Sequence, residues 1–97
     1  MTRDERILNQ IKVLNPVEVV LKNNSAQHAN HIEHIGGVAH TGETHYKLKI
    51  VSEVFNGLSR IDRQRKVYDL LSDEFKTGLH ALELKTYTPE EYQRKQN

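Results

Sequence analysis

The chain has no cysteine among its 97 residues and no apolar run that approaches the ~20 residues of a membrane-spanning helix. Without cysteine, no disulfide can brace the fold, and no thiolate of this chain can hold zinc or an iron–sulfur cluster. The charged start, Met1–Arg6, is followed by no apolar segment of the kind found in secretory signals. These absences favour a cytoplasmic protein in a reducing compartment that does not engage a membrane.

Positive and negative charges are nearly balanced, with 14 Lys and Arg against 13 Asp and Glu. This balance excludes attraction of the whole molecule to nucleic acid or anionic lipid, although a local basic patch remains open. A chain of this length has room for one hydrophobic core. We therefore expect residues 1–97 to form a single domain.

Two longer helices are predicted from capping signals and apolar spacing. Thr2 and Glu5 form a capping box at the start of a helix over residues 3–14. Ser59 caps a second helix, which is expected to kink and to end before Gly78. Its predicted apolar face consists of Ile61, Val67, Tyr68, Leu71 and Phe75.

Alternation of apolar and polar residues predicts three strands, at about residues 17–22, 46–50 and 79–87. The first two are expected to pair antiparallel across a long His-rich loop, residues 24–43. A loop of this length inside so small a domain is often functional or disordered.

A short closing helix is predicted from Thr88-Pro89-Glu90-Glu91, which reads as a cap, a proline at the first helical position and a capping-box glutamate. Residues 93–97 are expected to fray. The predicted fold is α+β, an αββαβ domain in which helices pack on one face of a three-stranded sheet and a short helix follows at the C-terminus.

Histidines are concentrated in and just after the predicted loop. Five of the six fall between residues 28 and 45, and they are His28, His31, His34, His40 and His45. The H-x-x-H-x-x-H spacing of the first three differs from the i, i+4 pair of helical metal sites. Neutral imidazole nevertheless binds zinc, iron, copper and nickel. A metal or cluster site and a merely polar, His-rich loop therefore both remain open.

The sixth histidine, His80, lies at the start of the third predicted strand, in phase with Leu82 and Leu84. On the residues alone, this phase favours a hydrogen-bonded histidine at the edge of the core over a ligand. A ligand role for His80 needs independent support.

Positive charges cluster at the start of the second predicted helix and on one face of the second strand. They are Arg60, Arg63, Arg65 and Lys66 on the helix and Lys47 and Lys49 on the strand. A basic helix start suits phosphate contacts, which makes these residues candidates for nucleic-acid binding. The alternative is a solvated helix face in which Asp62 and Asp69 are local partners.

Motifs of several enzyme classes are missing. The chain has no phosphate-binding G-x-x-x-x-G-K, no dinucleotide-binding G-x-G-x-x-G and no metalloprotease H-E-x-x-H sequence. No local pattern pairs a nucleophile with a base. The sequence therefore predicts a binding protein and not an enzyme.

Short motifs follow one another through the second half of the chain. They are Glu43-Thr44-His45-Tyr46, Val51-Ser52-Glu53-x-Phe55-x-Gly57, Arg63-x-Arg65-x-Val67-Tyr68, Leu71-x-x-Glu74, His80-Ala81-Leu82 and Thr86-x-Thr88-Pro89-x-Glu91. On these residues the chain resembles the BolA-like family, and its N-terminal part fits through Ser25-x-x-His28-Ala29-x-His31. The resemblance implies a class II KH-like αββαβ fold. The chain lacks the G-x-x-G loop of KH domains, so an RNA clamp of that type is not expected.

The resemblance also implies a partner and a cofactor. Family members partner monothiol glutaredoxins in iron–sulfur cluster assembly or delivery and in iron homeostasis. It implies a [2Fe–2S] cluster shared between the two proteins, with thiolates from glutaredoxin and glutathione and with His80 as a ligand. His28 matches the second ligand position, and His31, His34 and His40 are alternatives to it. No cluster is expected to bind tightly to the isolated protein, because the chain has no cysteine.

Other functions remain open. Bacterial BolA proteins are also DNA-binding transcriptional regulators, for which Arg60–Lys66 supply the candidate residues here. Many members read Arg-His-Arg where this chain has Arg63-Gln64-Arg65, so any role of that middle histidine is lost. A stand-alone zinc or nickel site in the His-rich loop is a further alternative. The protein alone is expected to be a monomer, with a weak homodimer as the alternative.

Overall fold

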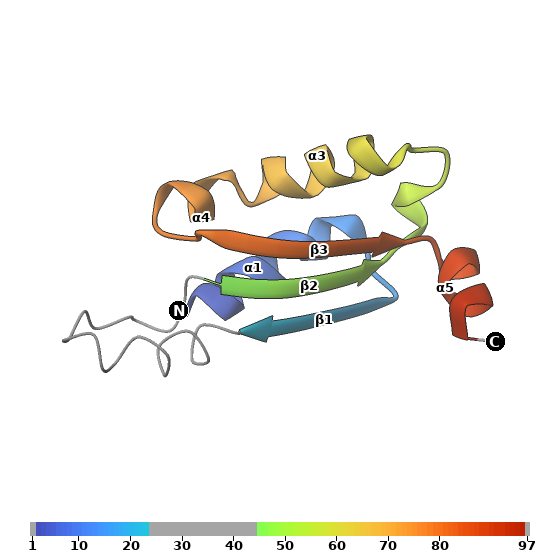
Figure 1. Cartoon of the computed structure of the whole chain (residues 1–97), viewed down its shortest axis with the longest axis horizontal. Helices are drawn as coiled ribbons and strands as arrows, with labels where there is room; N and C mark the ends of the chain where they lie inside the picture. Colours follow the sequence, from blue (N-terminus) through green and yellow to red (C-terminus); the bar gives the residue numbers. More distant parts are fainter. Residues whose placement is uncertain (1, 24–44, 97) are drawn as a thin grey trace.

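The computed structural model describes residues 2–23 and 45–96, which form a sheet covered by helices on one face (Figure 1). The strands are β1 (Glu18–Asn23), β2 (His45–Val51) and β3 (Ala81–Tyr87), in the spatial order β1-β2-β3. β1 pairs antiparallel with β2, as predicted, and β3 pairs parallel with β2. The predicted α+β fold with a three-stranded sheet is confirmed.

The first helix lies where it was predicted, although its last turn is tighter than an α-helix. α1 (Arg3–Ile11) begins after Thr2, whose hydroxyl accepts a hydrogen bond from the Glu5 N–H at 3.2 Å. The 3₁₀ turn η1 (Lys12–Leu14) follows, and Asn15 then adopts a left-handed conformation with φ of 47°. Asparagine is among the few residues that adopt this conformation readily, so the chain can turn toward β1.

The second predicted helix is divided into α3 (Arg60–Leu70) and α4 (Ser72–Lys76). Ser59 caps α3 as predicted, because its hydroxyl accepts a hydrogen bond from the Asp62 N–H at 3.1 Å. At Leu71, φ is −100° and ψ is 11°, so the expected kink is a break between two helices.

The predicted apolar face of this helix is partly wrong. Val67 and Leu71 are fully buried, but Ile61 is 60% exposed and Tyr68 is 40% exposed. Each helical residue turns by ~100° about the helix axis, so Ile61 and Tyr68 lie roughly a quarter to a third of a turn away from Val67. The face that meets the sheet is therefore narrower than the sequence pattern suggested.

The remaining helical segments lie at the end of the sheet where β2 and β3 finish. In the short 3₁₀ turn η3 (Glu53–Phe55), the Ser52 hydroxyl accepts a hydrogen bond from the Val54 N–H at 3.2 Å. α5 (Pro89–Gln96) is helical through residues 93–96, so the predicted frayed tail is wrong over those residues, and 97 lies outside the described residues. Pairing of Glu90 with Arg94 at 3.6 Å supports the helix along its length.

The core lies between one face of the sheet and the helices α1 and α3 (Figure 1). Alternate side chains of β2 point into it, and the main buried residues are Ile7, Ile11, Tyr46, Leu48, Ile50, Phe55, Val67 and Leu71. The opposite face of the sheet carries no helix within the described ranges. No helix in residues 2–23 or 45–96 has the length and apolar character needed to cross a membrane.

A buried carboxylate, Glu74, ties the N-terminal helix to the turn that precedes β3. Its side chain is 4% exposed and receives Arg3 Nη1 at 2.7 Å and Arg6 Nε at 2.9 Å. Its backbone carbonyl accepts hydrogen bonds from Arg3 Nη1 at 3.1 Å and from the Leu79 N–H at 2.9 Å. The turn includes Gly78, with φ of 132°, where a Cβ would come within 3.1 Å of Arg3 Nη2. The position at which β3 begins is therefore fixed by contacts with α1.

Replacing Glu74 by Ala is expected to lower the free energy of unfolding by about 3–5 kcal/mol, because the buried Arg3 guanidinium loses its anionic partner. Urea denaturation measures the change. Glu90→Ala is the matched control, since its surface pair with Arg94 should contribute less than about 1 kcal/mol. Equal stability of the two variants would contradict a structural role for Glu74.

Candidate functional site

His80 lies on the surface, directly before the first residue of β3. The alternating pattern predicted that His80 would point toward the core. In the structure the preceding residue, Leu79, is the buried one, with 3% exposure. The interpretation of His80 as a histidine at the edge of the core is therefore wrong. The reason is that β3 begins at Ala81 and not at Leu79, so the alternation along the strand does not extend back to His80.

A second histidine lies beside His80. His45 is the first residue of β2 and is paired in register with Ala81, because the parallel strands β2 and β3 begin at the same end of the sheet. The imidazole centroids of His45 and His80 are 6.4 Å apart, with their planes inclined by 49°. The imidazoles of His45 and His80 therefore lie near each other at the end of the sheet where His80 is exposed.

His45 was not among the ligands predicted from the sequence. Its neighbour Tyr46 is buried in the core, so the alternation of β2 directs His45 to the other face. The alternating pattern of β2 indicated the face of the sheet on which His45 lies. The parallel register with β3, which brings His45 near His80, cannot be predicted from the sequence of either strand alone.

The predicted loop ligands His28 and His31, with the alternatives His34 and His40, lie outside the described residues. In the described part of the chain, no group of three or more His, Asp or Glu side chains is placed to hold a metal ion. What residues 2–23 and 45–96 offer is a pair of neighbouring imidazole side chains, those of His45 and His80. Such a pair fits a ligand that takes its remaining donors from elsewhere.

Arg63, a predicted nucleic-acid contact, is engaged within the fold. Its Nη1 and Nη2 donate to the two carboxylate oxygens of Glu91 at 2.7 and 3.1 Å, and its Nε donates to the Leu58 carbonyl at 3.0 Å. Glu91 also accepts a hydrogen bond from the Thr88 N–H at 2.9 Å, and the Glu91 N–H donates to the Thr88 hydroxyl at 3.1 Å. The predicted capping box of α5 is thus complete. The Arg63 side chain is 13% exposed and links α3 to α5. Its role is therefore structural, and it is not displayed for nucleic-acid binding.

The other predicted cations lie on two different surfaces. Arg60, Arg65 and Lys66 are exposed on α3, where Arg65 lies 4.0 Å from Asp62 in a solvated contact. Lys47 and Lys49 project from the opposite face of the sheet, since Leu48, which lies between them in β2, points to the core. The structure therefore does not gather the predicted nucleic-acid contacts into one site.

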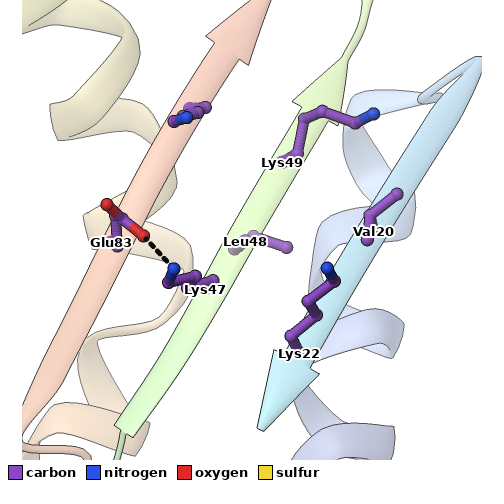
Figure 2. A pocket seen from close by; sticks show the side chains of 7 residues that line it. Val20, Lys22, Lys47, Leu48, Lys49 and Glu83 are labelled. Atoms are coloured by element: carbon purple, nitrogen blue, oxygen red, sulfur yellow. Dashed lines mark ion pairs between the residues drawn. The ribbon is translucent and has the colours of Figure 1, made fainter. Parts of the chain in front are cut away.

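Lysines instead gather on the open face of the sheet (Figure 2). A shallow cleft of about 310 Å³ there is lined by the four residues that we call the open-face lysines, together with Val20, Leu48 and Glu83. The open-face lysines are Lys22, Lys47, Lys49 and Lys85. Lys22 and Lys85 were not predicted, although the antiparallel register places Lys22 directly opposite Lys47.

Two of the open-face lysines have ion-pair partners. Lys47 lies 3.4 Å from Glu83 in an exposed pair. Lys49 contacts Glu18 at 2.7 Å and the Tyr92 hydroxyl at 2.6 Å, and these hydrogen bonds raise the pKa of Lys49 and lower that of Glu18. Within the described ranges, Lys22 and Lys85 have no ion pair. The cleft thus carries more positive than negative charge.

Comparison with known proteins decides the family. Residues 11–91 match the model of the BolA-like protein family. The chain belongs to the BolA-like family. The structure agrees, since BolA1 from Arabidopsis thaliana superposes with a TM-score of 0.81 at 42% identity, over 94% of this chain and 96% of that one.

Similar BolA-like relatives differ in length. Over 93 residues the chain is 45% identical to the UV-induced protein uvi31 of Schizosaccharomyces pombe, covering 94% of this chain and 90% of that protein. Over 91 residues it is 46% identical to SufE-like protein 1 of Arabidopsis thaliana, covering 93% of this chain but only 24% of that longer protein. A 50-residue match at 40% identity, over 52% of this chain and 48% of the relative, reaches the DNA-binding transcriptional regulator BolA of Haemophilus influenzae.

Stability should depend on pH through Glu91. Hydrogen bonds from Arg63 and from the Thr88 N–H lower the pKa of the Glu91 carboxyl from 4.5 to about 2. Because the pKa is lower in the folded state, the charged carboxylate stabilises the fold above pH 4.5, and this contribution is lost as the pH falls from 4.5 to 2. Glu91→Gln should lower the urea midpoint at pH 7 and make the decline below pH 4.5 shallower. Glu90→Gln is the control, and parallel midpoint curves for wild type and Glu91→Gln would contradict the assignment.

Proposed function

We propose that the chain is a non-enzymatic, cytoplasmic partner of a monothiol glutaredoxin. In this proposal it lends histidine ligands to a shared [2Fe–2S] cluster in iron–sulfur assembly or delivery, or in iron homeostasis. The observation that carries the proposal is the exposure of His80 with the His45 imidazole 6.4 Å away. Membership in the BolA-like family supports it.

The donor set suits a shared cluster. The chain has no cysteine, so thiolates for the iron atoms must come from the glutaredoxin and from glutathione. Replacing thiolate by neutral imidazole reduces the negative charge around a cluster and raises its reduction potential. Imidazole binds metal only when it is unprotonated, so binding of the shared cluster should weaken as the pH falls.

The surroundings of His80 also suit a ligand that meets a partner protein. Glu74 fixes the turn that leads into His80, because its backbone carbonyl accepts hydrogen bonds from Arg3 and from the Leu79 N–H. Since the backbone is held by this buried network, the imidazole can project from a defined position without being enclosed. A partner surface can therefore approach it at the end of the sheet.

A reconstitution experiment tests the proposal. The protein is mixed with a monothiol glutaredoxin, glutathione, iron and sulfide, and visible circular dichroism follows the cluster. A spectrum distinct from that of glutaredoxin alone is expected for wild type and is expected to disappear in His80→Ala. His45→Ala should weaken it if His45 is the second ligand, whereas Lys76→Ala, on the surface of α4, should leave it unchanged. A spectrum that is identical in wild type and His80→Ala would contradict the proposal.

DNA binding is the second candidate function, and we infer that it would use the open-face lysines in place of α3. One observation favours this surface over α3, and the name of a relative supports DNA binding itself. Lys22 and Lys85 have no ion pair in the described part of the chain, whereas Arg63 of α3 is held by Glu91. A relative with a 50-residue match carries the name of a DNA-binding transcriptional regulator.

The salt dependence of duplex binding distinguishes the two surfaces. If the open-face lysines contact phosphates, each one removed should reduce the log–log salt slope by about 0.9 in magnitude. Lys22→Ala and Lys85→Ala should therefore flatten the slope measured by fluorescence anisotropy, and Arg65→Ala on α3 should not. If no duplex binding is detected at low ionic strength, the proposed DNA-binding function is contradicted. If only Arg65→Ala changes the salt slope, the DNA-binding surface lies on α3 and not on the open face of the sheet.

A further inference from the structure

The outer edge of β3 carries backbone groups that the fold does not use. β3 is an edge strand with β2 on its inner side. The Tyr87 carbonyl accepts a hydrogen bond from the Ser52 N–H at 2.9 Å, so it points toward β2. Because backbone groups alternate in direction along a strand, those of Leu84 and Thr86 point to the outer edge. Within residues 2–23 and 45–96, nothing pairs with them there.

A cleft follows this edge between β3 and α3. One hollow of about 300 Å³ is lined by the consecutive residues Leu84–Tyr87, together with Arg60 of α3 and Lys95 of α5. Consecutive residues of a strand point to opposite faces, so a hollow that touches all of them lies along the edge of the strand. A second hollow of about 310 Å³ shares three of these residues and continues toward Leu58. An extended segment of chain could lie along both.

The charges around the cleft are mainly positive. Arg60, Lys85 and Lys95 line it, and among the described residues they have no carboxylate partner. Glu91, a carboxylate that borders the second hollow, is neutralised by two hydrogen bonds from Arg63. A segment that enters this cleft therefore meets uncompensated cations from α3, β3 and α5.

We propose that the outer edge of β3 binds an extended, acidic segment of a partner protein, which adds to the sheet as a further strand beside α3. An edge strand flanked by a helix is the arrangement in which peptide segments are added to a sheet in PDZ and PTB domains. The backbone of Leu84 and Thr86 supplies the pairing groups, and the three cations select acidic side chains. His80 lies at the other end of β3, so this proposal does not depend on a role in cluster binding.

Amide hydrogen exchange tests the pairing directly. The probe is an end-capped peptide in which Glu and Val alternate, added to isotope-labelled protein at low ionic strength. The Leu84 and Thr86 amides are expected to exchange at least ~10-fold more slowly with the peptide present, since a strand-paired N–H is protected from solvent. The Lys85 amide already faces β2 and serves as the internal reference, so it should change little. Unchanged exchange at Leu84 and Thr86 at saturating peptide overturns the proposal.

Two variants separate the pairing from the charge. Thr86→Pro removes an outward N–H at a position where an edge strand tolerates proline, and it is expected to abolish peptide binding while β2 pairing persists. Lys95→Glu should weaken binding by ~10-fold because it places a like charge beside the peptide. Lys76→Glu on α4 is the matched charge control and should bind as wild type does. Full affinity in both Thr86→Pro and Lys95→Glu overturns the proposal.

Discussion

The buried carboxylate of Glu74 is the constraint on which much of the structure depends. An ionised group can be buried only when it is paired and hydrogen-bonded, and Glu74 meets this condition through Arg3 and Arg6 of the N-terminal helix. Its backbone carbonyl at the same time holds the N–H of Leu79 in the turn before β3. One residue therefore connects the first helix, the end of the helical layer and the start of the last strand. His80 owes its position to this connection although it does not contact Glu74.

Features that depend on neighbours in sequence were predictable. The caps at Thr2 and Thr88 and the alternation in β2 are local signals, and the structure bears them out. The buried face of α3 was not predictable, because the rotation of a helix against a sheet is decided by packing from distant segments. Tyr68 lies ~100° around the α3 axis from the buried Val67, which leaves it partly in solvent despite its helical spacing.

Prediction of the site was limited in the same way. The histidine of the His80-Ala81-Leu82 motif could be singled out, but its exposure depended on β3 beginning at Ala81, two residues later than predicted. His45 enters the site only through the parallel register, and Arg63 leaves the candidate surface only because α5 folds back onto α3. Each outcome joins segments far apart in the chain. The type and spacing of a residue indicate which ligands it could bind. Whether its side chain is exposed and close to other ligating groups depends on the tertiary structure.

Parallel pairing of β2 and β3 has a consequence for the timing of ligand capture. A crossover that contains α3 and α4 separates the two strands in sequence, so His45 and His80 meet only after this crossover has closed. During synthesis, His45 leaves the ribosome before His80, and the nascent chain then presents only one of the two imidazoles. A ligand that requires both binds only the finished fold, and its binding free energy stabilises that fold.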